Sequence, residues 1–205
     1  MFFDTKTEQF LLFLFIGIIM FQFFTESAHG SMNIFKTKRY LLENIQINKL
    51  DIFYSAISAT FIGFLFNFVA FCFGNLLLND SFSWSILYFP LVLINLIIMI
   101  LATQLIFATI SIYLKDIDSI WFVLNNLLFW GSGIFIDLSN LGGLPALIKY
   151  YNPLAGIFMN ARDVLIYARP LDHQLLAINM LTAIVFLIIG LWGFKKYSAY
   201  ALEKL

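Results

Sequence analysis

Five long stretches of the 205-residue sequence contain no charged side chain, and this pattern restricts the fold more than any other feature. All 12 basic and 12 acidic residues lie outside these stretches, which are Gln9–Thr25, Ile52–Asn79, Ser81–Leu114, Ser119–Ile136 and Gln174–Phe194. A helix that rises about 1.5 Å per residue crosses a hydrocarbon core of about 30 Å in roughly 20 residues. Since the stretches lack the alternation of a membrane β-barrel strand, we predict an all-α membrane protein.

We expect five transmembrane helices, at about residues 9–25, 52–79, 84–114, 119–136 and 174–194. Lys and Arg collect in segment 26–51 and in the C-terminal tail, and such clusters mark the cytoplasmic side of a membrane protein. Alternation across five spans then places the N-terminus and the long segment 137–173 outside. The predicted topology has an outer N-terminus and a cytoplasmic C-terminus.

The two long segments between spans are predicted to be structured. Residues 31–50 have apolar side chains on one helical face, which indicates a short amphipathic helix at the inner surface. In segment 137–173 we expect two short outer re-entrant helices, the second starting at Asn152 as N-cap and Pro153 as first helical residue. That helix is too short to cross. Arg162 lies at the edge of its apolar stripe, and Asp163 points the opposite way.

Several uncharged polar residues lie inside the predicted spans: Asn67, Asn95, Gln104, Asn125 and Asn126. They serve either as hydrogen-bonding groups between helices, which we favour, or as the lining of a solute path. No Asp, Glu, Lys or Arg falls within a span. This absence argues against transport driven by a buried carboxylate relay.

The sequence contains no recognisable catalytic, metal-binding or nucleotide-binding motif. It has no G-x-x-x-x-G-K-[ST], so we expect no ATP to bind this chain, and Gly131-Ser132-Gly133 lacks the third glycine of a dinucleotide fingerprint. The single Cys72 excludes an intramolecular disulfide, and the two histidines are predicted to lie on opposite sides of the membrane. Asp116 and Asp118 form a pair in a tight turn; solvated charges at the end of a span are favoured over a metal-binding pair.

The order of several short motifs resembles that of the ABC-2 type permeases that export bacterial capsule, O-antigen and teichoic-acid polymers. The motifs are Lys115–Ser119, Trp130–Phe135, Asn152-Pro153-Leu154, Arg162, Leu191–Lys196 and Glu203, preceded by Arg39–Glu43 and Asn48–Asp51. The resemblance covers nearly the whole chain. The family ordinarily begins with an inner-surface helix and one further span, giving six spans, and we expect this sequence to lack both. Prolines that the family often carries before the next span are absent from Ile45–Ser55.

The resemblance implies a division of labour between chains. A homodimer of permeases would surround the path of a lipid-linked glycan in the bacterial inner membrane, and a separate P-loop ATPase would bind ATP and magnesium. Segment 26–51 and the 115–118 turn would contact the ATPase, and segment 137–173 would form an outer gate. The implied coupling residues are Lys36, Arg39, Lys49, Asp51, Lys115, Asp116 and Asp118, and the implied gate residues are Asn152, Pro153 and Arg162.

Two other functions remain open from the sequence. The chain can be a membrane-embedded accessory or assembly subunit of a cell-envelope complex that transports nothing. It can also be a lipid-modifying membrane enzyme, which we favour least because it lacks a recognisable catalytic arrangement. Association with an ATPase separates the exporter from both alternatives, and turnover of a lipid-linked sugar by the chain alone identifies the enzyme.

Overall fold

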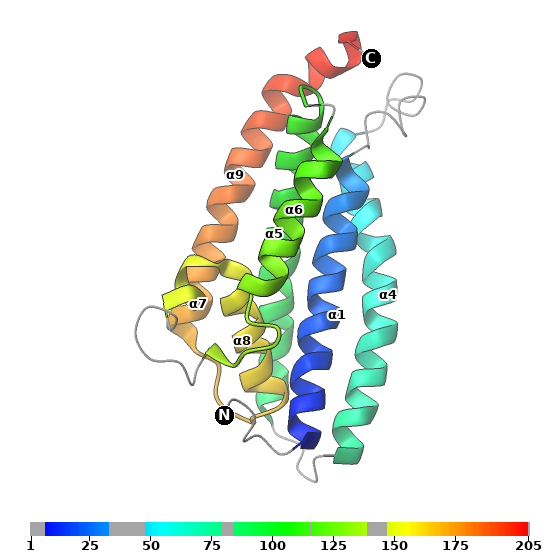
Figure 1. The fold of residues 1–205 in the computed structure, drawn as a ribbon. Helices are drawn as coiled ribbons and strands as arrows, with labels where there is room; N and C mark the ends of the chain where they lie inside the picture. The colour runs from blue at the N-terminus through cyan, green and yellow to red at the C-terminus, as the bar shows by residue number, and fades with distance from the viewer. Residues whose placement is uncertain (1–6, 33–47, 79–83, 115, 139–146, 205) are drawn as a thin grey trace.

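The chain folds as a bundle of helices of unequal length (Figure 1). The computed structural model describes residues 7–32, 48–78, 84–114, 116–138 and 147–204, and these contain no strand. The helices are α1 (Thr7–Met32), α4 (Lys49–Leu78), the 3-10 helix η1 (Trp84–Tyr88), α5 (Phe89–Ser111), α6 (Ile117–Gly131), α7 (Ile148–Tyr151), α8 (Pro153–Leu165) and α9 (His173–Lys204). The prediction of an all-α protein is confirmed.

Four helical segments in the described part of the chain are long and apolar enough to cross a membrane: Gln9–Met32, Lys49–Leu77, Trp84–Ser111 and His173–Tyr197. These helices lie side by side, and in Figure 1 α1, α5 and α9 run upward whereas α4 runs downward. The chain is therefore a multi-pass membrane protein. Which side of the membrane each end occupies stays a prediction.

The predicted span 119–136 differs from the structure, because helix α6 has only 15 residues and ends at Gly131. At about 1.5 Å per residue it is about 22 Å long, short of a full crossing. Ser132 is its C-cap, and Gly133 follows with φ +68°, the left-handed conformation in which glycine commonly ends a helix. The prediction of a helix through Ile136 is wrong for this reason.

The first predicted span is also too short, because α1 continues past Thr25 to Met32. Glu26 and the residues after it remain helical, with Ser27 hydrogen-bonded to Thr60 of α4 over 2.5 Å. The charged residue Glu26 therefore does not end this helix. Residues 33–47, which include most of the predicted amphipathic helix, lie outside the described residues.

Phenylalanine side chains fill the contacts between the helices. Phe23 of α1 stacks on Phe64 of α4 with ring centroids 5.1 Å apart, and Phe68 of α4 stacks on Phe89 at the start of α5 at 4.7 Å. In the apolar stretches of α1 and α5 more than half of the residues are buried, whereas in those of α4 and α9 less than a quarter are buried. α1 and α5 are therefore the interior helices, and α4 and α9 expose broad apolar faces.

The polar residues within the helices fall into different groups. Gln104 of α5 donates to the Ser27 carbonyl of α1 over 2.8 Å, and Asn125 of α6 accepts from Thr25 of α1 over 2.9 Å. These two confirm the predicted interhelical role. By contrast, the amides of Asn67 and Asn126 donate to carbonyls of their own helices, so the prediction is wrong for them. Asn95 belongs to neither group: its buried amide makes no hydrogen bond within the described chain.

Helices α5 and α9 run parallel and in close contact along their length (Figure 1). Glycine permits this approach: a Cβ on Gly190 would lie 3.0 Å from Cβ of Leu105 and 3.1 Å from the carbonyl oxygen of Ala102. One turn further on, Gly193 faces Thr109 at ordinary contact distance, with a Cβ there 3.7 Å from Cγ2 of Thr109. The two helices thus form a rigid parallel pair, against which the shorter helix α8 packs.

Candidate functional site

The candidate site lies where α6 ends and α8 begins, and Asn152 connects the two. Its Oδ1 accepts from the backbone N–H of Leu154 at 3.1 Å, which caps α8, and Pro153 occupies the first turn of that helix. Its Nδ2 donates to the carbonyl of Gly131 at 3.0 Å and to Oγ of Ser132 at 3.3 Å. One side chain therefore caps the start of α8 and the end of α6. The predicted helix start is confirmed.

Arg162 is the only buried cationic side chain among the described residues, with 5% of its surface exposed. Its Nε donates to the carbonyl of Phe13 in α1 at 3.3 Å, Nη1 to the carbonyl of Gly133 at 2.7 Å and Nη2 to that of Ile134 at 3.0 Å. The guanidinium carbon also lies 3.5 Å from the centre of the Phe13 ring. We call this set of contacts the Arg162 clasp.

The clasp joins three parts of the chain that are distant in sequence: α1, the irregular segment after α6, and α8. Carbonyls outside a helix need a donor when they lie at membrane depth, and the planar guanidinium supplies several in fixed directions. Gly17 makes room for it, because a Cβ at that position would lie 2.5 Å from Nη2 of Arg162. The position of Arg162 at the edge of an apolar stripe did not predict its burial, which follows from its backbone partners.

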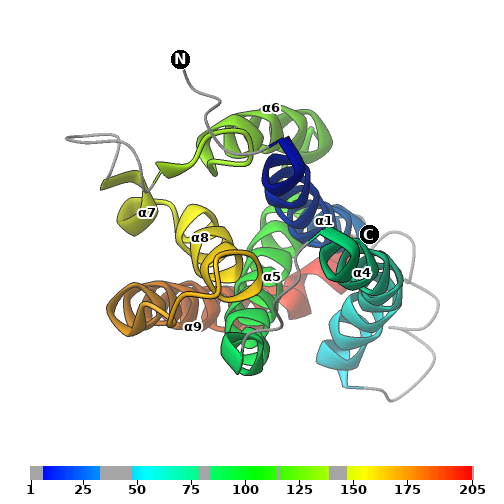
Figure 2. The same cartoon turned by 90° about the horizontal axis from the view of Figure 1, so that it is seen from below.

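Helix α8 is almost completely enclosed, although it is too short to cross a membrane. Seen from below, it lies among α1, α5 and α9, inside the bundle (Figure 2). The prediction that Asp163 points away from the packed face is also wrong. Asp163 is buried, 3.5 Å from the largely exposed Arg169. Its carboxylate is thus held at the rim of the bundle by a cation that faces solvent.

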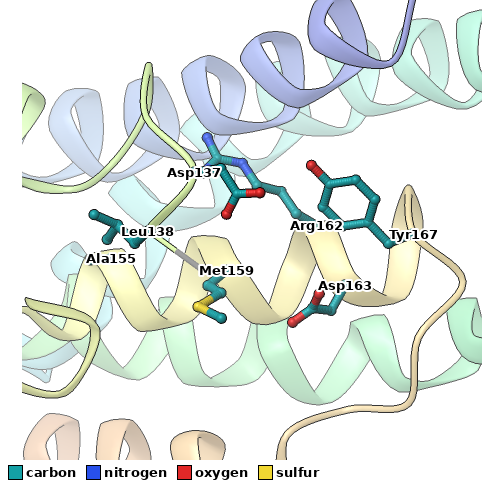
Figure 3. Close-up of a pocket in the computed structure, with 7 residues that line it drawn as sticks. All are labelled: Asp137, Leu138, Ala155, Met159, Arg162, Asp163 and Tyr167. Atoms are coloured by element: carbon teal, nitrogen blue, oxygen red, sulfur yellow. The ribbon is translucent and has the colours of Figure 1, made fainter. Parts of the chain in front are cut away.

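A shallow pocket opens beside the clasp (Figure 3). Its lining consists of Asp137, Leu138, Ala155, Met159, Arg162, Asp163 and Tyr167. Burial lowers the pKa of Arg162 to about 9, against the opposing influence of Tyr167, Asp137 and Asp163, so the guanidinium stays charged at neutral pH. Burial raises the pKa of Asp163, and Arg169 offsets part of that rise. The pocket therefore combines acidic and basic groups.

The geometry of this site suits mechanical closure better than covalent chemistry. Asn152 and Arg162 are engaged in capping and in joining segments, and the described residues contain no group of three His, Cys, Asp or Glu side chains that could hold a metal. A movement of α8 would have to break the clasp and the Asn152 contacts together. The site can therefore act as a catch that holds α8 within the bundle.

The residues predicted to contact an ATPase lie at the opposite end of the molecule from η1. Lys49 and Asp51 begin α4, and Asp116 and Asp118 begin α6, and both starts are at the top of Figure 1. Asp118 lies 4.0 Å from His29 in the last turn of α1. The structure thus brings these residues to one end. Lys36, Arg39 and Lys115 lie outside the described residues.

Sequence reasoning missed several residues of this site. Gly17 and Gly133 each make a close approach or a turn possible, and Phe13 contributes a carbonyl oxygen and a ring. A glycine inside an apolar helical stretch is costly, and that cost was the available signal for Gly17. The backbone acceptor at Phe13 had no signal in the sequence.

Comparison with known proteins gives an independent indication of function. No family model matches the chain. Over 196 residues it is 23% identical to a Klebsiella pneumoniae protein named O-antigen export system permease protein RfbA, covering 93% of this chain and 74% of that protein. A second Klebsiella pneumoniae protein of the same name is 24% identical over 195 residues, with the same coverage. The resemblance to polysaccharide-export permeases that the motifs indicated is confirmed.

Proposed function

We propose that this chain is the permease subunit of an ATP-driven ABC exporter in the bacterial inner membrane, moving a lipid-linked polysaccharide or a related cell-surface polymer. The similarity to two O-antigen export permeases over 93% of the chain carries the proposal. The membrane-spanning helices are consistent with it. Since the sequence contains no P-loop, ATP and magnesium bind a separate ATPase subunit.

In this proposal the two ends of the molecule have different tasks. Asp116 and Asp118 are exposed at the start of α6, where a cytoplasmic ATPase can contact them, and Asp51 is exposed at the start of α4. The Arg162 clasp lies at the other end, where α8 closes the outer half of the bundle. A second copy of the chain completes the path, and the exposed apolar faces of α4 and α9 are available for that copy or for lipid.

The test is reconstitution of the chain with a P-loop ATPase from the same cells. We expect the two proteins to purify together, and we expect ATP hydrolysis to rise when the permease is present. Asp116→Ala should abolish this stimulation while leaving the folded permease intact, because Asp116 is exposed and caps α6 without a side-chain hydrogen bond. Lys149→Ala, at the opposite end, is the matched control and should preserve it. Failure of any ATPase to associate, in cells or in detergent, would refute the proposal.

A further inference from the structure

Two fully buried asparagines lie between α5 and α9 without any hydrogen bond. Asn95 of α5 and Asn179 of α9 are both 0% exposed, and neither the nitrogen nor the oxygen of either amide has a partner within the described chain. Buried polar groups are nearly always paired, because an unmet donor or acceptor loses its bonds to water and gains nothing in return. Unpaired amides at such positions therefore need an explanation.

The packing of the parallel pair places these two asparagines at one level. Gly190 faces Ala102 and Leu105, and Gly193 faces Thr109, so residues 84 to 88 positions apart lie side by side. By that offset Asn95 is level with residues 179–183. Asn95 is also seven residues before Ala102, hence on the same helical face, and Asn179 is eleven residues before Gly190 and shares its face. The two amides thus lie at about the same level, on the faces that α5 and α9 turn toward each other.

Helix α8 covers this level from the side. A Cβ on Gly156 would overlap the Asn179 amide, so α8 lies directly against it. Four residues further along the same face of α8, Asn160 is also fully buried. Its oxygen accepts from the backbone N–H of Asp172 at 3.2 Å, whereas its amide nitrogen has no partner within the described chain. We call Asn95, Asn160 and Asn179 the amide layer.

The chemistry of the amide layer fits an uncharged, hydroxyl-rich ligand. Each amide has donors and an acceptor, as a sugar hydroxyl does, and none of the three side chains carries a charge that would hold an ion. We propose that the amide layer is a binding site for sugar hydroxyl groups, which α8 covers in this state and exposes when the Arg162 clasp opens. This inference rests on the proposed export function, whose substrate it specifies as the hydroxyl groups of a neutral glycan segment.

The first experiment measures when water reaches the layer. Asn179→Cys is introduced into a Cys72→Ala chain, assembled with its ATPase and treated with a membrane-impermeant maleimide. We expect no labelling at rest and labelling during ATP turnover with glycan-bearing membranes from the producing cells. Ile188→Cys, at a position of α9 that is 60% exposed on the apolar surface, is the control and should stay unlabelled in both states. Adding Arg162→Met should allow labelling of the Asn179→Cys chain at rest.

The second experiment separates binding from packing. In the double variant Asn95→Leu, Asn179→Leu the unpaired amides are gone, so the melting temperature should equal or exceed that of the original chain. The glycan concentration for half-maximal export should nevertheless rise at least tenfold. Asn67→Leu is the control, because the Asn67 amide bonds only the Gly63 carbonyl of its own helix at 3.2 Å. It should leave export unchanged.

Each outcome decides between the two proposals. If the original complex exports glycan but the Asn179→Cys chain is never labelled, or the double variant exports with an unchanged half-maximal concentration, the amide layer is not a glycan site and the export function stands. If the original complex associates with the ATPase yet moves no glycan, the export function itself fails, and the glycan site fails with it.

Discussion

Replacing Arg162 with methionine tests whether the clasp holds α8 within the bundle. The change keeps an unbranched side chain of similar length but removes the donors that reach Gly133 and Ile134 at 2.7 and 3.0 Å. Each buried carbonyl left without a donor costs about 1–3 kcal/mol, so the pair costs about 2–6 kcal/mol. The carbonyl of Phe13 lies inside α1, where a helical bond remains available, and adds little.

One opposing effect reduces this sum. The buried guanidinium has lost its hydration, and methionine does not carry that cost, so we expect a net loss of about 2–4 kcal/mol. For a chain of this length about 1 kcal/mol shifts the melting temperature by about 2–4 °C, which gives a fall of about 4–16 °C. The melting temperature of Arg162→Lys should lie between those of the original chain and Arg162→Met. One ammonium group keeps the charge but cannot donate in the fixed directions of the planar guanidinium.

Thermal unfolding of the purified chain in detergent measures this difference. The control is Lys149→Met, which removes a cation from the same segment whose contact is a tyrosine ring 5.0 Å away. It should cost less than about 1 kcal/mol. If Arg162→Met melts within about 2 °C of the original chain, the clasp does not stabilise the structure and the reasoning is wrong.

Three further changes test the packing and the electrostatics of the bundle. Gly17→Ala should lower the melting temperature, since its Cβ would lie 2.5 Å from the guanidinium, whereas Gly30→Ala in the same helix meets nothing within 4 Å and should raise stability by up to about 1 kcal/mol. Gly190→Ala should also lower the melting temperature, because the added carbon meets the α5 backbone at 3.1 Å; an unchanged value would contradict the close α5–α9 contact. Burial raises the pKa of Asp163, so the folded chain binds more protons there than the unfolded chain, and this contribution to stability falls as the pH rises above about 4. Asp163→Asn should remove that pH dependence, and a melting curve with the same dependence would exclude Asp163 as its source.

The sequence was sufficient to predict those features that depend on composition and local chemistry. Charge-free stretches of adequate length predicted the long helices, and Asn152-Pro153 predicted the start of α8. Gly131-Ser132-Gly133 also carries a helix-stop signal, which the predicted span to Ile136 did not take into account. It is the C-terminal end of α6, and a glycine with positive φ after the cap is its ordinary form.

The clasp and the amide layer could not be predicted in the same way. Arg162 is buried because three backbone carbonyls from two distant segments converge on it, and backbone acceptors leave no pattern in a sequence. Asn95 was expected to form hydrogen bonds between helices, and Asn179 was not singled out. The parallel register of α5 and α9 places them at one level, and Gly156 lets α8 approach Asn179.

The clasp also has a consequence for the order in which this protein matures. The acceptors at Gly133 and Ile134 precede Arg162 by 29 and 28 residues, and the acceptor at Phe13 precedes it by 149. During synthesis the segment after α6 is therefore made before the side chain that donates to it. Exposed carbonyls are costly in lipid, so that segment must wait near water or in a protein-lined environment until α8 arrives. The docking of α8 is thus the step that supplies donors to these carbonyls, and it depends on a single side chain.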